Sequence, residues 1–279
     1  MPLGSNSYGK SGIRLVKLAR RDGRHDVQDL MVAVRFEGDF EAAHAAGDNS
    51  GVLPTDTMKN TVYALAKDRP GEEIEDFALA LSDHFLRENR EVSRVEISIE
   101  ERVWDRIGGT AFEGSSDERR TACVSRSRAG ASVESGLKDL LIMKTAQSGF
   151  SGFKRDRYTT LKETSDRILA TSLTAAWTHA TAAGPFADAW RAVRRTLLDA
   201  FVAHDSASVQ HTLHAMGEAA LANHAGLSWI RMTMPNKHHL LVDLSPFGLK
   251  NENEIFVATD EPYGLIEATV IRDGSESQR

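Results

Sequence analysis

The spacing of the apolar residues changes twice in each half of this chain, from a repeat of two to a repeat near 3.6 and back to two. A repeat of two places alternate side chains on one face of a strand, and a repeat near 3.6 places them on one face of a helix. Each half of the chain therefore reads as two strands, two helices and two further strands. Because runs of strands around paired helices favour an antiparallel sheet with helices on one face, this order predicts an α+β fold.

The first half shows the order clearly. Its strand-like runs cover residues 13–18, 30–36, 95–99 and 119–127, and its helical runs cover residues 58–66 and 74–85. Thr55 and Asp56 stand just before the first helix, where a side-chain oxygen can accept a free backbone N–H, so either is a candidate N-cap. Pro70 and Gly71 are expected to end that helix.

The second half repeats the order without repeating the residues. Its strand-like runs cover residues 132–144, 168–177, 229–234, 240–244 and 265–271, and its helical runs cover residues 186–201 and 209–220. Asp205 or Ser206 is a candidate N-cap of the second helix. Small residues gather near Gly130, which predicts a first domain of residues 1–131 and a second domain of residues 132–279.

The composition narrows the class of protein. Hydrophobic residues make up 41% and charged residues 27% of the chain, which is ordinary globular usage, and the net charge of −6 argues against a nucleic-acid partner. No run approaches the roughly 18 apolar residues of a membrane span, so no membrane partner is expected. The first residues contain no apolar signal core and the final ESQR is no organelle address, which predicts a cytoplasmic location. The single Cys123 excludes an intrachain disulfide.

One pattern near the start resembles a phosphate-binding loop. Gly4, Gly9, Lys10 and Ser11 fit G-x-x-x-x-G-K-[ST]. That loop binds phosphate because a strand precedes it and a helix follows it, so that backbone N–H groups converge. Here only three residues precede Gly4 and a strand-like run follows Ser11, so the pattern does not indicate a nucleotide site.

The histidines give little support to a metal site. His211 and His214 lie three residues apart on an expected helix, but no H-E-x-x-H motif occurs and Cys123 has no close cysteine or histidine in the sequence. Neighbouring helical histidines are more often solvated than metal-bound. No G-x-S-x-G motif occurs either, so a hydrolase of that type is not supported.

Several polar residues stand at the expected ends of helices and strands. They are Lys10, Thr55, Asp56, Arg167, Gln210, Asn236 and His238, of which the last two lie in the motif MPNKHH that is expected to connect two strands. Taken alone, each has an ordinary structural interpretation, such as a surface lysine, a helix cap or an arginine paired with Glu163.

Six segments contain these residues and fall in one order along nearly the whole chain. They are YGK (8–10), VLPTDTMKNTVYALAK (52–67), SGLKDLLIMK (135–144), SGFSGFKRDRYTTLKETSDRIL (148–169), SASVQ (206–210) and MPNKHHLLVDLS (234–245). In order and spacing they resemble the urate oxidase (uricase) family. The resemblance implies two tandem tunnelling-fold (T-fold) domains, each an antiparallel four-stranded sheet with two helices on one face. It also implies a barrel-like homotetramer with active sites between subunits.

The resemblance further implies which residues bind the substrate. Phe150 would stack on the flat purine, since an aromatic ring suits a planar ligand. Arg167 would offer its planar fork to an oxygen and a ring nitrogen and would favour the urate anion. Gln210 would bind the opposite edge with an amide that both donates and accepts, and the backbone N–H of Val209 would add a donor.

The remaining roles concern the neighbouring chain and the chemistry. Thr55 and Asp56 would reach the same purine from the neighbouring chain, and Asn236 would hold dioxygen or the water that replaces it. Lys10, Thr55 and His238 would form a proton relay, because each step of urate oxidation moves a proton. The implied reaction converts urate, dioxygen and water into 5-hydroxyisourate and hydrogen peroxide. It needs neither a metal nor an organic cofactor, since dioxygen is a co-substrate.

Two other functions use the same fold. A pterin- or purine-handling T-fold enzyme, such as a cyclohydrolase or an aldolase, is one, but cyclohydrolases need zinc ligands that this sequence does not assemble. A non-catalytic purine-binding protein is the other, and it would keep Phe150, Arg167 and Gln210 but lose the relay. The presence of Lys10, Thr55 and His238 together argues against it. Fold alone does not decide among these functions.

Overall fold

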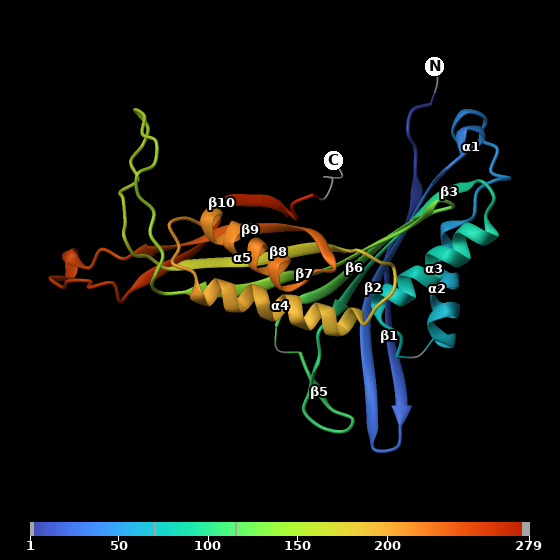
Figure 1. Cartoon of the computed structure of the whole chain (residues 1–279), viewed down its shortest axis with the longest axis horizontal. Coiled ribbons are helices and arrows are strands. Elements are labelled where there is room, and N and C mark those ends of the chain that lie inside the picture. The colour runs from blue at the N-terminus through green and yellow to red at the C-terminus, as the bar shows by residue number, and fades with distance from the viewer. Residues whose placement is uncertain (1–2, 70, 115, 275–279) are drawn as a thin grey trace. The chain divides into compact units, whose positions relative to one another are not determined.

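The computed structural model of the chain describes residues 3–69, 71–114 and 116–274 (Figure 1). Spatial proximity divides the chain into two compact units. Unit 1 comprises Met1–Gly136 and Ala176–Trp190, and unit 2 comprises Leu137–Ala175 and Arg191–Arg279. Each unit therefore takes residues from two separate stretches of sequence, and the domain boundary after residue 131 stays a prediction.

Unit 1 is an antiparallel sheet with two main helices. Its elements are β1 (Tyr8–Arg21), β2 (Arg24–Gly38), α1 (Glu41–Ala46), α2 (Thr55–Asp68), α3 (Ile74–Glu88), β3 (Val92–Arg102), β4 (Asp105–Arg106), β5 (Phe112–Glu113) and β6 (Arg119–Ser127). Strands β1, β2, β3 and β6 pair in that order, while β4 and β5 pair only with each other. Helix α2 packs on β1, and α3 packs on β3 and β6 (Figure 1). The expected order of elements is confirmed, with α1, β4 and β5 as additions.

The core of unit 1 lies between the sheet and these helices. Val95, Ile97 and Ile99 alternate along β3 and are fully buried against α3. From the helix side, Phe77 and Phe85 fill the same layer. The repeat of two and the repeat of 3.6 thus meet at one apolar interface, as the sequence predicts.

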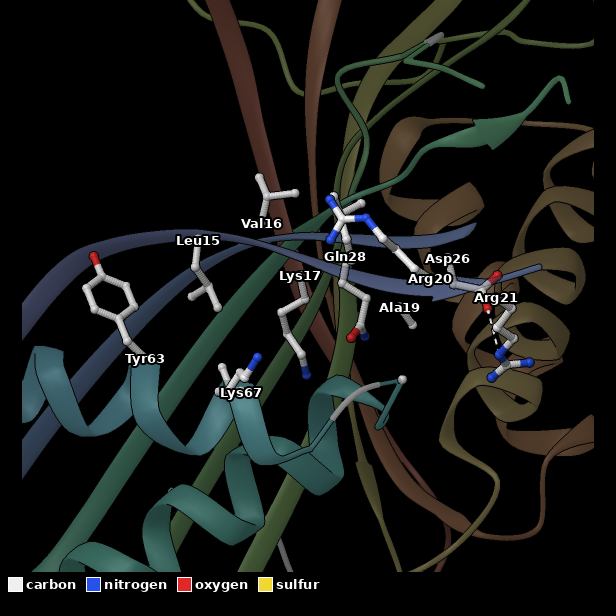
Figure 2. Close-up of a pocket in the computed structure, with 13 residues that line it drawn as sticks. Leu15, Val16, Lys17, Ala19, Arg20, Arg21, Asp26, Gln28, Tyr63 and Lys67 are labelled. Carbon is white, nitrogen blue, oxygen red and sulfur yellow. Dashed lines mark ion pairs between the residues drawn. The ribbon is translucent and has the colours of Figure 1, made fainter. Parts of the chain in front are cut away.

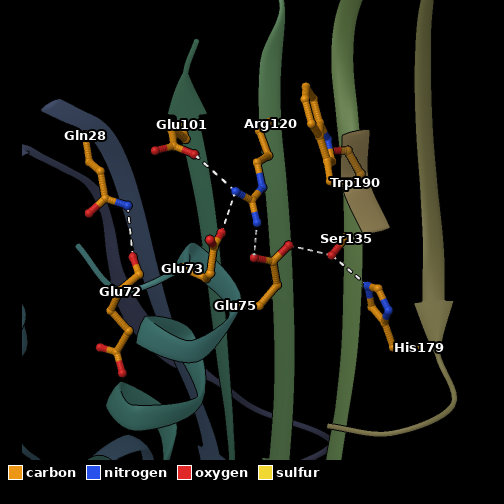
Figure 3. A network of polar contacts seen from close by, with 10 residues as sticks. Gln28, Glu72, Glu73, Glu75, Glu101, Arg120, Ser135, His179 and Trp190 are labelled. Carbon is orange, nitrogen blue, oxygen red and sulfur yellow. Dashed lines mark hydrogen bonds and ion pairs between the residues drawn. The ribbon is translucent and has the colours of Figure 1, made fainter. Parts of the chain in front are cut away.

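A buried polar network crosses the same unit (Figure 3). The guanidinium of Arg120 on β6 donates to Glu75 at 2.6 Å and to Glu73 at 2.8 Å, and it lies 3.8 Å from the carboxylate of Glu101 on β3. Ser135 Oγ donates to the second oxygen of Glu75 at 2.5 Å, and His179 Nε2 lies 2.8 Å from Ser135 Oγ. The single hydroxyl proton of Ser135 is used in its hydrogen bond to Glu75. Ser135 Oγ can therefore only accept from His179, so His179 Nε2 is the donor in the last bond of the network.

Unit 2 contains the second set of elements. Strand β7 (Gly130–Lys144), β8 (Leu169–His179) and α4 (Phe186–Ala203) each supply residues to both units, and α5 (Val209–Asn223), β9 (Leu227–Leu241), η1 (Ser245–Phe247) and β10 (Phe256–Ile271) belong to unit 2. Helix α5 packs on β9 and β10. Its Gly217 permits this close approach, since a Cβ there would lie 2.4 Å from Val270 Cγ2.

The motif MPNKHH corrects one prediction. It does not connect two strands, because β9 runs without a break from Leu227 to Leu241. Burial alternates through the motif, so Asn236 follows Met232 and Met234 on the buried face while Pro235 and Lys237 face the other way. Proline and polar side chains suggest a loop in the sequence, but the strand tolerates them because the alternation continues.

Two helix caps also differ from the predictions. Thr55 and Asp56 lie in the first turn of α2, whose N-cap is Pro54, and Ser208 rather than Asp205 or Ser206 caps α5. A helix boundary can shift by one or two residues while its apolar face stays the same, which is why the face was predictable and the cap was not. Helix α2 ends at Asp68, two residues before Pro70, which lies outside the described residues.

Two further sequence patterns are settled by the fold. Lys10 and Ser11 lie inside β1 rather than before a helix, so the context of a phosphate-binding loop is missing. Among the helices formed by the described residues, none combines the length and apolar character that a membrane crossing requires.

Candidate active site

Phe150 and Arg167 lie together in unit 2, although 16 residues separate them in sequence. The Arg167 guanidinium carbon lies 5.3 Å from the centroid of the Phe150 ring. The main chain of Phe150 exchanges two hydrogen bonds with Thr164, of 2.8 and 3.0 Å, which brings the two segments side by side. Phe153 stacks on the Phe150 ring at 5.0 Å. The sequence prediction that these two residues share a site is therefore consistent with the geometry.

Arg167 carries an unused donor in this cluster. Its Nε is buried and has no hydrogen-bond partner among the described residues. Burial also lowers the pKa of Arg167 below its ordinary value. A buried N–H without an acceptor costs roughly 1–3 kcal/mol, so an acceptor supplied by a ligand would be favourable here. A planar anion with a ring nitrogen and an oxygen on one edge matches such a donor.

The first turn of α5 is joined to the segment before Phe150. The backbone N–H of Ser206 donates to Gln147 O at 2.9 Å, and the N–H of Gly149 donates to Ser206 O at 2.7 Å. Val209 and Gln210 begin the helix three residues later. Since the first N–H groups of a helix have no partner within it, the start of α5 offers backbone donors, and it is joined through Ser206 to the segment that precedes Phe150.

Asn236 and His238 lie in β9 on its helix-facing side. Asn236 is 8% exposed, whereas His238 is half-buried. The pairing of β9 with β10 shifts register between Thr259 and Gly264, which are the partners of His238 and Asn236. Such irregularities often redirect side chains near functional sites. The contacts known for the described residues join Phe150 to Arg167 but join neither of them to Asn236 or His238.

Lys10, Thr55 and Asp56 form a second group, in unit 1. Lys10 is the last residue of β1 before a register shift that ends at Ile13. Asp56 lies in the first turn of α2 and binds Lys59 Nζ at 2.5 Å. The hydrogen bond and charge of Lys59 hold the pKa of Asp56 below its ordinary value, and the charge of Lys10 adds to this effect. The charge of Lys10 is therefore felt at the start of α2.

Sequence reasoning missed Tyr8, the first residue of β1, whose side chain binds the segment just before α2. The hydroxyl oxygen of Tyr8 accepts a hydrogen bond from Leu53 N at 3.0 Å, two residues before α2 begins. Its ring meets the edges of Phe36 and Phe40 at 5.7 and 4.7 Å. Burial raises the pKa of Tyr8, so the hydroxyl stays protonated. The sequence signal that could have identified Tyr8 is its position in the motif YGK, two residues before Lys10.

Two histidines of α5 each have one other possible metal ligand nearby. The His211 ring lies 4.3 Å from that of His204, and His214 Nδ1 lies 3.3 Å from Glu218. Within the described part of the chain, no three His, Cys, Asp or Glu side chains gather as metal ligands would.

A cavity of about 660 Å³ lies elsewhere in unit 1, between β1 and α2 (Figure 2). Basic side chains and one tyrosine surround it, including Lys17, Arg20, Lys67 and Tyr63. Lys17 is already engaged, because its ammonium donates to Arg69 O at 2.8 Å. None of the predicted site residues lines this cavity, so it is separate from the two groups above.

The comparisons of this chain with known proteins all give the same family. The family model described as Uricase matches residues 6–128 and 133–267. The uricase of Arthrobacter globiformis is 46% identical over 99% of this chain and 91% of its own length, and the uricase of Danio rerio is 36% identical over 95% and 93%. The crystal structure of the Arthrobacter globiformis uricase superimposes with a TM-score of 0.96 at 45% identity, covering 100% of this chain and 98% of that one. A Bacillus fastidious uricase, at 24% identity and a TM-score of 0.82 over 95% and 93%, shares the fold.

Proposed function

The chain belongs to the uricase family, and we propose on that basis that it oxidises urate with dioxygen and water to 5-hydroxyisourate and hydrogen peroxide. Two electrons pass from urate to dioxygen, which leaves as hydrogen peroxide, and water supplies the hydroxyl oxygen of the product. The enzyme is accordingly an oxidoreductase. The wild-type reaction is proposed to need no metal and no organic cofactor, as the family resemblance implies.

One observation carries the assignment of the substrate site. An aromatic ring, a guanidinium with an unused buried donor and the start of a helix converge in unit 2. In the proposed complex Phe150 stacks on the purine, and Arg167 binds one edge as a charge-assisted donor. Gln210 and the N–H of Val209 bind the opposite edge. This arrangement holds a flat anion in one plane and one orientation.

The chemistry is proposed to use the other residues. Lys10, Thr55 and His238 relay the protons that leave urate and later reach peroxide, while Asn236 holds dioxygen above the ring. The effect of the Lys10 charge on Asp56, the neighbour of Thr55, supports the first part of this relay. Thr55 and Asp56 are proposed to come from a neighbouring chain, which requires an oligomer, and we propose the homotetramer of the resemblance. A cytoplasmic location stays a prediction.

The test follows the ultraviolet absorbance of urate with purified protein. We expect the absorbance to fall in air in the presence of a metal chelator, with one hydrogen peroxide formed per urate consumed. Under nitrogen the absorbance should not change, because dioxygen is the electron acceptor. Binding of urate without turnover in air would favour the non-catalytic alternative, and loss of activity with the chelator would contradict the cofactor-free proposal.

A further inference from the structure

The hydroxyl groups at the start of α5 form a buried chain that the roles above do not use. Ser206 is 1% exposed and Thr212 is fully buried. Thr212 Oγ1 donates to Ser206 Oγ at 2.7 Å, and Ser206 Oγ donates to Ser208 O at 3.0 Å. Ser206 has only one hydroxyl proton, so its bond to Ser208 leaves its oxygen free to accept the proton of Thr212.

Ser206 is the point at which this chain meets the aromatic cluster. Its main chain makes the two hydrogen bonds to Gln147 and Gly149 that precede Phe150. Its side chain lies on the α5 side, between Thr212 and Ser208. One residue therefore fixes the helix start to the segment that carries the ring.

Ser208 passes the same constraint to the first turn of α5. As N-cap it accepts the N–H of His211 on its Oγ at 3.1 Å, and its carbonyl accepts the N–H of Thr212 at 3.1 Å. Val209 and Gln210 lie directly after it. Their position relative to Phe150 thus depends on Thr212, Ser206 and Ser208 acting together.

We propose that Thr212 is a positioning residue for purine binding, which acts through Ser206 on the first turn of α5. This proposal rests on the urate site described above. Without the Thr212 hydroxyl, Ser206 Oγ keeps its bond to Ser208 O but loses the one bond that it accepts, and the first turn can shift against the Phe150 segment. Misplacement of a binding group by about 1 Å is enough to reduce its contribution substantially.

The experiment compares Thr212→Val with Thr212→Ser. Valine keeps the branched shape and removes the hydroxyl, whereas serine keeps the hydroxyl and removes the methyl group. We expect Thr212→Val to raise KM for urate about fivefold to tenfold, with kcat within about twofold, because Gln210 binds the ring before and during the reaction. The Kd for urate under nitrogen should rise by the same factor. Thr212→Ser should restore both values to within about twofold of wild type.

Thr196→Val is the matched control. Thr212 Oγ1 lies 3.3 Å from the carbonyl four residues earlier, Ser208 O, and Thr196 on α4 likewise donates to Ala192 O at 3.1 Å. Thr196 Oγ1 lies 3.0 Å from Nε2 of His224, at the far end of α5 from its start. Thr196→Val should leave KM unchanged. An unchanged KM in Thr212→Val, or an equal loss in Thr212→Ser, would overturn the positioning role.

Two further outcomes are decisive. If Thr212→Val does not fold, Ser206→Ala removes the middle hydroxyl and keeps both main-chain bonds, so its KM must rise by the same factor or the proposal fails. If the wild-type protein itself neither binds nor oxidises urate, the proposed function is wrong and this proposal falls with it. A wild type that turns over urate beside a variant with normal KM rejects only the role of Thr212.

Discussion

Glu101→Gln should make the stability of this protein less dependent on pH. Burial, only partly offset by the charge of Arg120, raises the pKa of Glu101 to about 7 from the ordinary 4.5. Between pH 4.5 and about pH 7 the folded chain therefore keeps a proton on Glu101 that the unfolded chain releases. Stability that depends on this proton is present at low pH and is lost as the pH rises through about 7.

The magnitude follows from the two pKa values. Their difference corresponds to roughly 3 kcal/mol of unfolding free energy, lost between about pH 4.5 and pH 8. The charged groups that face Glu101 are Arg120 on β6, Glu73 and Glu75 at the start of α3, and Lys17 on β1. Burial is the main reason that Glu101 retains its proton, and the charges of Glu73 and Glu75 add to it, since one arginine serves all three carboxylates (Figure 3).

The assay is urea unfolding of wild type and Glu101→Gln from pH 5 to pH 8.5, at one protein concentration because the proposed oligomer would unfold in a concentration-dependent way. The free energy of unfolding of the variant minus that of wild type should increase by up to about 3 kcal/mol as the pH rises. Glu100→Gln removes the same charge from the other face of β3 and should show no such movement. Parallel pH curves for wild type and Glu101→Gln would refute the reasoning.

Three substitutions test the proposed site. Lys10→Met should lower kcat by about a hundredfold or more and leave the Kd for urate under nitrogen nearly unchanged, because it removes a proton carrier; equal losses of binding and turnover would contradict that division. Arg167→Ala should weaken urate binding by about 1.5–3 kcal/mol, measured by equilibrium titration under nitrogen, and unchanged affinity would mean that the arginine binds no anion. Tyr8→Phe removes the acceptor for Leu53 N and should lower kcat about threefold to tenfold with a stability loss near 1 kcal/mol. Full kcat in that variant would show that the hydroxyl does not position Lys10 and α2.

Much of the fold was predictable because burial imposes a period on the sequence. Val95, Ile97 and Ile99 alternate as a half-buried strand does, and the steps of three and four residues that join Ile74, Phe77, Ala78, Leu81 and Phe85 are those of a helix. The short α1, β4 and β5 contain too few apolar residues to show a period. The break predicted at Pro235 was wrong because the local propensity of a proline was outweighed by the pairing of β9 with β10.

The candidate site was predictable only in part. Phe150 and Arg167 came from the family resemblance, since neither periodicity nor spacing says that a ring and a guanidinium 16 residues apart will meet. The supporting residues were missed for a physical reason. A tyrosine or threonine that bonds a distant main-chain atom looks the same in sequence as one that faces water, as Tyr8 and Thr212 show.

The segment Ala176–Trp190 has a consequence for how this protein evolved. It comes from the second half of the sequence, yet His179 completes the Glu75 network of unit 1, Phe186 lies in the same core, and the indole of Trp190 donates to Gly136 O at 2.8 Å. If the two halves arose by duplication of one gene, each ancestral copy once folded without a segment contributed by the other half. Unit 1 now depends on both halves of the sequence, so residues 1–136 expressed alone should remain partly unfolded until a peptide of residues 169–190 is added.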